Sequence, residues 1–239
     1  MNKDTTQQGG KKEKVRNMFD SIAGHYDFLN HFLSFGIDKL WRHRVLKYAS
    51  QQKPQKILDV ATGTADLAIT LSKCQPQQIV GVDISEEMLK IGREKITKKG
   101  LSGLITLKSG DSEALPFSDR SFDLVTAAFG VRNFEDLDKG LREMNRVLKP
   151  GAKLMILEFS KVSGFPWKIL FNFYFKFILP TLGRLISKHD FAYSYLPESV
   201  NAFPSGENFL EHLKAAGFAE TRQERLNGGI ASIYFGEKK

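Results

Sequence analysis

Cysteine is almost absent from this sequence of 239 residues, which contains only Cys74. An internal disulfide is therefore excluded, and the composition fits a reducing, cytoplasmic compartment. The five histidines are scattered without the spacing of metal ligands, so no bound metal is expected. No uninterrupted apolar run reaches the roughly 18 residues that a transmembrane helix needs. The polar residues 1–14 also lack the apolar core of a signal peptide.

Acidic residues are outnumbered by basic ones, which gives a formal net charge of +8. Nucleic acid or an anionic membrane surface could explain this excess. The basic residues gather at 11–16, at 95–99 and at the C-terminus, so solvated ends and faces explain the charge better, and no nucleic-acid partner is expected. Residues 1–14 are expected to form a disordered basic tail. The length of the remainder, 15–239, suits a single α/β domain.

A short apolar run followed by small residues is the most informative stretch of the chain. Ile57 to Val60 is typical of a buried parallel strand, and residues 61–65 form a small-residue turn that contains Gly63 and Thr64. A helical pattern follows. Strand, tight turn and helix N-terminus form the first half of a nucleotide-binding βαβ unit, in which backbone N–H groups approach a ligand closely.

A second apolar run, residues 79–82, ends in Asp83 about 20 residues beyond the turn. In such folds a carboxylate at this point binds the hydroxyls of a ribose. The turn lacks the other glycines of a dinucleotide fingerprint, and Asp59 would repel a pyrophosphate. A nucleoside that carries an ammonium and no phosphate suits this charge better, and S-adenosylmethionine is such a ligand. An ordinary turn without a ligand is the simpler interpretation, but Asp83 favours nucleoside binding.

The residues before the first strand, 15–50, show helical spacing with an interruption at 23–27. Because this segment precedes the sheet, we expect it to pack over the mouth of the ligand site as a helical lid. His25 and Tyr26 could line that mouth. Alternatively, Tyr26 is an aromatic residue that packs the lid and His25 caps a helix.

Polar residues follow the third and fourth predicted strands as well. Asp111 and Ser112 come after the strand at 104–107, where an acid can accept a hydrogen bond from an adenine amino group, although Asp after Gly is also common in turns. Arg132 follows the strand at 122–129, an end that should face both cofactor and substrate. The alternative for Arg132 is a surface salt bridge to Glu135 or Asp136.

The C-terminal third contains an apolar block and a hairpin signal. Residues 165–180 are apolar on almost all sides, which is typical of a core helix or of a groove for a long apolar substrate. Residues 161–205 are read as an insertion on the substrate side, with 189–205 irregular and Ser205 capping the next helix. The turn Asn227-Gly228-Gly229 before an extended run predicts a terminal antiparallel hairpin.

Several motifs together resemble a known family. They are Phe19-Asp20-Ser21-Ile22-Ala23, Asp59-Val60-Ala61-Thr62-Gly63-Thr64, Gly110-Asp111-Ser112-Glu113-Ala114-Leu115-Pro116-Phe117, Phe129-Gly130-Val131-Arg132-Asn133 and Leu157-Glu158-Phe159-Ser160. On these residues the chain resembles the ubiquinone/menaquinone biosynthesis C-methyltransferase family from about Val15 to its end. Two departures are Ala65, where many members have Gly, and Ala128, where some have a Ser that contacts the cofactor.

The resemblance implies a Rossmann-like, seven-stranded fold with a mostly parallel sheet and a C-terminal antiparallel hairpin. It implies S-adenosylmethionine as co-substrate, bound at Gly63, Thr64, Asp83, Asp111 and Ser112. It also implies methylation of a ring carbon of a prenylated quinol. Whether the substrate is a naphthoquinol or a benzoquinol is left open. The protein is expected in the cytoplasm, with peripheral contact to the inner face of the cytoplasmic membrane. Whether it forms a homodimer is left open.

The implied reaction needs a reduced ring whose carbon attacks the sulfonium methyl, so orientation is the main task of the protein. Removal of a phenolic proton needs a base or a polarised water. His25 and Tyr26 could supply the base, and Arg132 could polarise the water or stabilise the phenolate. An NAD-dependent oxidoreductase is disfavoured by the missing glycines. A nucleic-acid methyltransferase is disfavoured because residues 127–130 lack the Asn/Asp-Pro-Pro-aromatic segment of enzymes that methylate exocyclic amines.

Overall fold

The computed structural model of the chain describes residues 10–34, 36–161 and 190–239. The helices with their bounds are α1 (Lys11–Leu33), α2 (Ile37–Gln52), α3 (Asp66–Leu71), α4 (Glu86–Lys98), α5 (Leu137–Val147), α8 (Asp190–Ala202) and α9 (Glu207–Ala215). The strands are β1 (Lys56–Val60), β2 (Gln78–Asp83), β3 (Ile105–Ser109), β4 (Phe122–Ala128), β5 (Leu148–Phe159), β6 (Phe218–Leu226) and β7 (Ala231–Lys238). Short 3₁₀ turns are η1 (Ser72–Cys74), η2 (Val131–Asn133) and η4 (Asn227–Gly229).

The seven strands form one sheet in the order β3-β2-β1-β4-β5-β7-β6. The first five run parallel, whereas β7 pairs antiparallel with both β5 and β6. The predicted α/β fold with a C-terminal antiparallel hairpin is confirmed. The order reverses between β1 and β4, and an open parallel sheet binds its ligands at such a reversal, beyond the carboxyl ends of the strands.

Both faces of the central strands are buried, which explains their continuous apolar sequence. Ile57 and Leu58 of β1 point to opposite faces and are fully buried. Leu58 packs in a cluster that includes Leu141 of α5. Ile57 belongs to the opposite cluster, which includes Val45 of α2. Each such side chain contributes about 1.5–3 kcal/mol by leaving water, so the two layers of helices hold the sheet rigidly beneath the ligand end.

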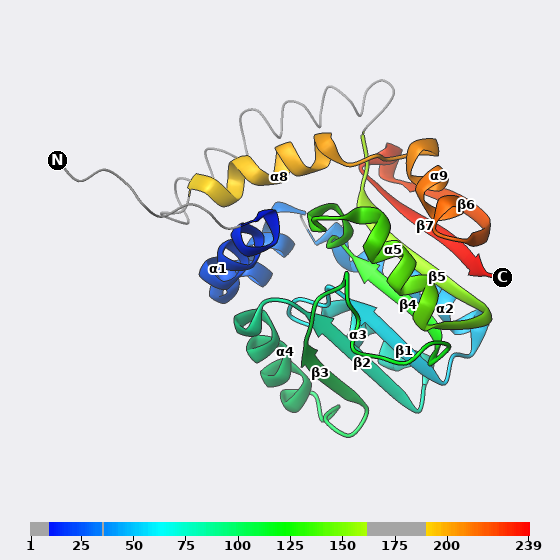
Figure 1. The fold of residues 1–239 in the computed structure, drawn as a ribbon. Helices are drawn as coiled ribbons and strands as arrows, with labels where there is room; N and C mark the ends of the chain where they lie inside the picture. The colour runs from blue at the N-terminus through cyan, green and yellow to red at the C-terminus, as the bar shows by residue number, and fades with distance from the viewer. Residues whose placement is uncertain (1–9, 35, 162–189) are drawn as a thin grey trace.

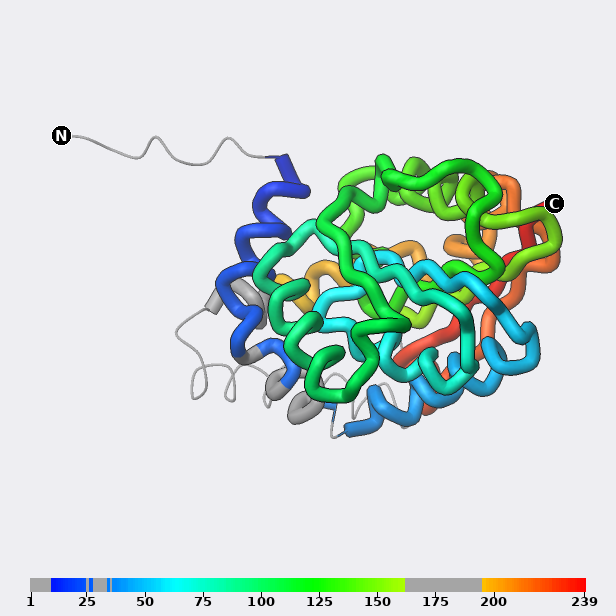
Figure 2. Tube along the Cα trace, turned by 90° about the horizontal axis from the view of Figure 1, so that it is seen from below, coloured from blue at the N-terminus to red at the C-terminus, as the bar shows by residue number. Residues whose placement is uncertain are grey.

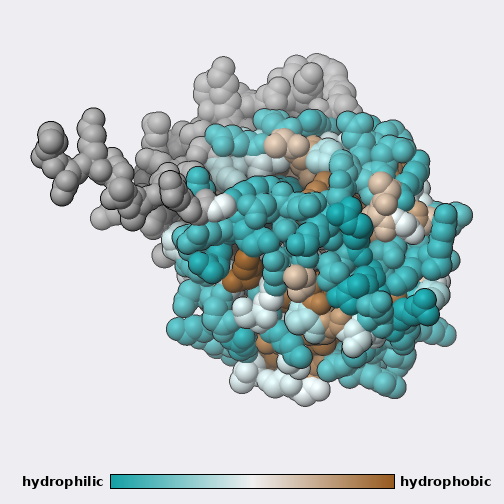
Figure 3. All heavy atoms as spheres, viewed as in Figure 1, coloured by the Kyte–Doolittle hydropathy of each residue, from teal (hydrophilic) through white to brown (hydrophobic). Residues whose placement is uncertain are grey.

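Two helices lie at that ligand end. Figure 1 shows α1 and α8 beyond the carboxyl ends of the parallel strands, while α1 packs against α4 and α8 against η2. Figures 1 and 2 both place α1 and the C-terminus at opposite ends of the molecule. The face seen in Figure 3 is mostly hydrophilic, with small separate apolar areas. Among the helices within the described ranges, none is long and apolar enough to cross a membrane.

The N-terminal segment differs from the prediction in two ways. The helix α1 begins at Lys11, inside the predicted disordered tail, and it continues through residues 23–27, where an interruption was expected. A glycine inside a helix costs only about 1 kcal/mol, so Gly24 does not end α1. Contacts between α1 and the sheet, described below, supply the order that its local sequence does not indicate.

The segment before α9 also differs from the prediction. The range 189–205 was expected to be irregular, but Asp190–Ala202 form α8 with Pro197 inside it. The cap of α9 is Gly206, not Ser205. The hydroxyl of Ser205 instead accepts a hydrogen bond from the backbone N of Lys161 at 3.3 Å. The apolar block 165–180 lies outside the described residues.

Candidate active site

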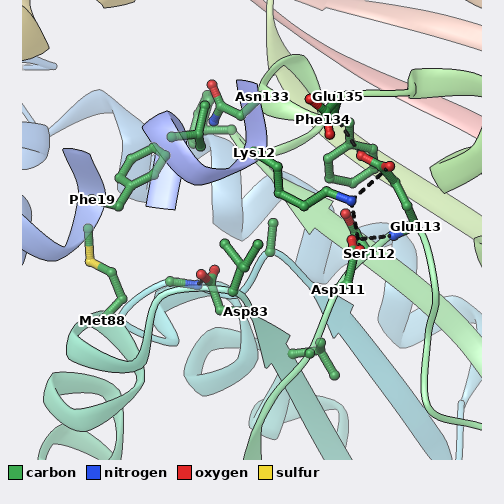
Figure 4. A pocket seen from close by; sticks show the side chains of 18 of the residues that line it. Lys12, Phe19, Asp83, Met88, Asp111, Ser112, Glu113, Asn133, Phe134 and Glu135 are labelled. Carbon is green, nitrogen blue, oxygen red and sulfur yellow. Dashed lines mark hydrogen bonds and ion pairs between the residues drawn. The ribbon is translucent and has the colours of Figure 1, made fainter. Parts of the chain in front are cut away.

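A cavity opens at the carboxyl ends of the parallel strands, bounded on one side by α1 (Figure 4), and holds about 700 Å³ of space including its open mouth. Five of the residues that the sequence analysis selects line it together: Tyr26, Gly63, Asp83, Asp111 and Ser112. They come from α1, from the last residue of β2 and from the turns that follow β1 and β3. The sheet therefore brings residues distant in sequence into one site, as its topology predicts.

The turn after β1 is tightly wound. Ala61, Gly63 and Ala65 all have positive φ angles, of 52°, 54° and 67°. A left-handed residue other than glycine costs roughly 1–2 kcal/mol, so the conformation of Ala65 explains why glycine would be preferred at this point. Compact residues allow this winding, which directs the backbone N–H of Gly63 toward Asp83.

Asp83 ends β2 and ties that strand to the turn. Its Oδ2 accepts a hydrogen bond from the backbone N of Gly63 at 2.8 Å, and its Oδ1 accepts one from the backbone N of Ser85 at 2.9 Å. Burial raises the pKa of the Asp83 carboxyl, and the backbone donors at Ser85 and Gly63 only partly offset that effect. Because each carboxylate oxygen has a second lone pair, Asp83 can still accept two ribose hydroxyls.

Asp59 lies beneath the turn and is not part of the cavity lining. Only 1% of it is exposed. Its oxygens accept hydrogen bonds from the hydroxyls of Thr62 at 2.6 Å and Thr126 at 2.8 Å. Burial raises the pKa of Asp59 to about 6, against the lowering effect of these two hydroxyls. At neutral pH the buried carboxylate therefore places a negative charge behind the turn, outside the cavity lining.

This raised pKa predicts opposite pH trends for the folding stability of the protein and for its binding of S-adenosylmethionine, the methyl donor that the sequence implies. In the folded state Asp59 takes up a proton as the pH falls through about 6, before an unfolded aspartate does at about 4. Its effect on folding is therefore favourable at low pH and is lost as pH rises through this window. Affinity for a cationic donor should instead fall below pH 6, as measured by calorimetry. In Asp59→Asn this fall should shrink, and an undiminished fall would contradict the assignment.

Lys12 closes the side of the cavity that Asp111 lines. Figure 4 shows its side chain reaching Asp111 and Glu113, with Nζ–O distances of 2.7 and 3.0 Å. Burial would raise the pKa of Asp111, but the Lys12 ammonium and the backbone N of Glu113 together hold it below its ordinary value. Asp111 therefore remains an anionic acceptor.

Tyr26 lines the cavity, whereas Thr64 lies behind the cavity wall. The Thr64 side chain is buried and donates a hydrogen bond to Asp27 Oδ1, so it supports the turn from behind. Tyr26 lines the cavity, edge-on to Phe19 at 5.9 Å between ring centroids. Burial raises the pKa of the Tyr26 phenol. His25 belongs to α1, but its side chain lies outside what the structure describes.

Arg132 lies one layer behind the cavity, in η2. Its Nη1 is 2.9 Å from Oε1 of Glu158, and their side chains are 7% and 0% exposed. The same guanidinium group donates to the backbone oxygen of Phe129 and to Ser199 Oγ of α8. Its ion-pair partner is thus the buried Glu158 rather than Glu135 or Asp136, which corrects the surface alternative.

Sequence reasoning missed three residues of the site. Lys12 was assigned to a disordered tail, and Glu113 was quoted only as part of a motif. Glu113 Oε1 accepts hydrogen bonds from the backbone N of Glu135 and Asp136 at 2.9 and 3.2 Å, so it joins two loops. Asn133 lines the cavity and accepts a hydrogen bond from Tyr195 of α8 at 3.1 Å. Asn133 could have been selected from the sequence, because it directly follows Arg132 in the same motif.

The seven-stranded sheet and the acidic cavity at its carboxyl end, together with the relatives below, define an S-adenosylmethionine-dependent methyltransferase. The chain belongs to the ubiE/COQ5 methyltransferase family, which matches residues 7–238. It is 49% identical over 231 residues to a protein of Bacteroides fragilis named demethylmenaquinone methyltransferase, covering 96% of this chain and 94% of that protein. It is 46% identical over 230 residues to the ubiquinone/menaquinone biosynthesis C-methyltransferase UbiE of Geotalea daltonii, covering 95% and 97%.

Solved structures share the fold at much lower identity. A methyltransferase of Thermotoga maritima, described as S-adenosylmethionine-dependent and a possible histamine N-methyltransferase, superposes with a TM-score of 0.59 at 18% identity, covering 94% of this chain and 99% of its own. The [4+2]-cyclase SpnF superposes with a TM-score of 0.66, also at 18% identity, covering 96% and 97%. Because one architecture hosts such different reactions, these structures support the fold alone.

Proposed function

We propose that this protein transfers the methyl group of S-adenosylmethionine to a ring carbon of a prenylated quinol, converting demethylmenaquinol to menaquinol. The cavity carries the proposal, because it combines acidic acceptors for a nucleoside with aromatic side chains that suit a flat ring. Asp83 and Asp111 supply the acceptors, while Phe19 and Phe129 supply rings. The names of the relatives in Bacteroides fragilis and Porphyromonas gingivalis support the naphthoquinol as substrate.

The residues present fit the methyl donor. Asp83 would hold the ribose, Gly63 would allow close approach of the amino-acid portion, and Asp111 with Ser112 would border the adenine. The buried charge of Asp59 complements the ammonium and sulfonium groups of the donor. When bound, the donor supplies an electrophilic methyl group. Thr64 contributes by shaping the turn, since its hydroxyl points to Asp27.

The remaining side chains handle the proton and charge of the quinol. The raised pKa keeps Tyr26 protonated at neutral pH, so its hydroxyl suits hydrogen-bond donation to a phenolate better than removal of a proton. Arg132 lies behind Phe129 and Asn133, where the part of its positive charge that Glu158 does not offset would favour the negative charge that develops on the ring oxygen. His25 is retained as a candidate base on the grounds of its place in the sequence.

The N-terminal helix is proposed to act as a lid over the donor. Three of its side chains contact the three cofactor segments: Lys12 binds Asp111, Asp20 accepts from Ser85 Oγ at 2.6 Å, and Asp27 accepts from Thr64. These residues are spaced at about two helical turns, so they share one face of α1. These three contacts fix α1 against all three segments, as a lid over the donor requires.

The prenyl tail is proposed to lie along residues 165–180 while the enzyme rests on the membrane surface from the cytoplasmic side. Each methylene-sized group of the tail gains about 0.8 kcal/mol by leaving water. This segment lies outside the described residues, so its role rests on its apolar sequence. The prediction of a homodimer likewise stays open.

A transfer assay with labelled donor tests the proposed function. Demethylmenaquinol should accept the methyl group. Its oxidised form, demethylmenaquinone, should not, because an electron-poor ring carbon cannot attack a sulfonium. A benzoquinol with the same tail, assayed in parallel, separates the ubiquinone-pathway alternative. Transfer in the strict absence of reductant, or failure with both reduced rings, would contradict the proposal.

A further inference from the structure

Lys95, in the last turn of α4, joins three segments that surround the donor site. Its Nζ lies 2.7 Å from Oδ2 of Asp27 in α1 and 3.1 Å from Oγ1 of Thr64. It also forms an ion pair with Asp66, the first residue of α3. All three hydrogens of the ammonium group therefore have an acceptor.

Two of these partners are next to residues that line the cavity. Thr64 follows Gly63, and Asp27 follows Tyr26, with Gly63 and Tyr26 both in the lining. Thr64 Oγ1 donates to Asp27 Oδ1 while Lys95 bonds both groups, so the three side chains form a closed ring of hydrogen bonds. This ring fixes the separation between the turn that receives the donor and the helix that carries Tyr26.

The ring extends to α2 through Asp66. Oδ2 of Asp66 lies 3.6 Å from Nη2 of Arg42, and Arg42 is also paired with Asp38. Isolated pairs at the surface contribute little to stability. Here the side chains of Lys95, Asp27 and Asp66 are only 22%, 30% and 20% exposed, and each shares a partner with another. A connected, half-buried network of this kind constrains geometry more than a single exposed pair does.

We propose that Lys95 is a positioning residue for the methyl transfer, acting through Thr64 and Asp27 to hold the donor turn and the Tyr26 wall at a fixed separation. The proposal rests on the proposed function, since it assumes that S-adenosylmethionine occupies this turn. Lys95 lies behind the wall and does not itself contact the reacting atoms. Its loss should widen the site and weaken binding of the donor, while the chemistry at saturating donor is largely retained.

The test compares Lys95→Met with Lys98→Met, a matched change at an exposed lysine in the same last turn of α4. Lys95→Met should raise the KM for S-adenosylmethionine about tenfold while kcat changes less than about threefold. Lys95→Arg, which keeps the charge and several donors, should recover most of the affinity. Lys98→Met should behave as wild type, and melting temperatures identify any variant that is merely less stable.

Coupling to the lid is tested with Asp27→Asn. Because both residues act in one ring, the double variant with Lys95→Met should bind the donor no more weakly than the poorer single variant. Additive losses, or an unchanged KM in Lys95→Met, would overturn the positioning role. If wild type and Lys98→Met fail to bind S-adenosylmethionine at all, the proposed function itself fails, so the two outcomes are distinguishable.

Discussion

Replacing Arg132 with alanine is expected to lower kcat about tenfold, less than the roughly 100-fold loss of a donor that touches a developing oxyanion, because Arg132 lies one layer behind the cavity. The guanidinium lies behind the backbone oxygen of Phe129 and beside Asn133, both at the cavity wall. The guanidinium is thus proposed to act on the ring oxygen from behind the cavity wall, with its charge partly offset by the paired Glu158. The KM for the donor should change little, because the donor segments are built from other residues.

The same substitution also leaves Glu158 as an unpaired charge. With Glu158 fully buried, breaking the pair should cost about 3–5 kcal/mol of folding free energy. A loss of activity in Arg132→Ala alone could thus reflect unfolding. The double variant Arg132→Met/Glu158→Met separates the two effects, because replacing both charges by apolar side chains of similar volume is often neutral for stability.

We expect the double variant to melt close to wild type and yet to remain about tenfold slower. Glu237→Gln serves as a control, since it breaks a half-exposed ion pair with Lys153 on the same strand β5 and should leave turnover unchanged. Recovery of wild-type turnover in the double variant would show that Arg132 is purely structural.

The features predicted from sequence are those that depend on neighbouring residues. The strand 57–60, its small-residue turn and the acid at Asp83 form one local unit whose period and spacing carry the signal. The parallel sheet then follows, because β-strands separated by helices must cross over in one sense. This is why Gly63, Asp83 and Asp111 were found together in the cavity, as expected.

The features that were missed depend on contacts between distant segments. Lys12 and Asp111 are 99 positions apart, and Lys95 and Asp27 are 68 apart. A lysine in a polar segment looks the same whether it meets solvent or a distant carboxylate, so neither pairing could be predicted. Arg132 shows the same limit: its residue type indicated a charged partner, but the sequence favoured the nearby Glu135 over Glu158 from strand β5.

Replacing Asp83 with alanine is expected to weaken binding of S-adenosylmethionine by roughly 1.5–3 kcal/mol, which is the contribution of hydrogen bonds to a charged acceptor. The effect has two parts. The ribose loses its acceptor, and the backbone N–H groups of Gly63 and Ser85 lose theirs, so the turn after β1 also loosens. Asp83→Asn separates these parts, because an amide oxygen can still accept from one backbone group while the charge is gone.

Asp123 provides a matched control at the other end of the sheet. Its carboxylate likewise accepts backbone hydrogen bonds, from Gln55 at 3.2 Å and Lys56 at 2.8 Å, but it lies at the start of β4, away from the cavity. Asp123→Ala should therefore lower the melting temperature without changing the dissociation constant for the donor, as measured by calorimetry. For Asp83→Ala we expect the dissociation constant to rise at least about tenfold in a folded protein. A folded Asp83→Ala variant that binds the donor as tightly as Asp123→Ala would remove Asp83 from the donor site, because both variants lose backbone hydrogen bonds but only Asp83 lines the cavity.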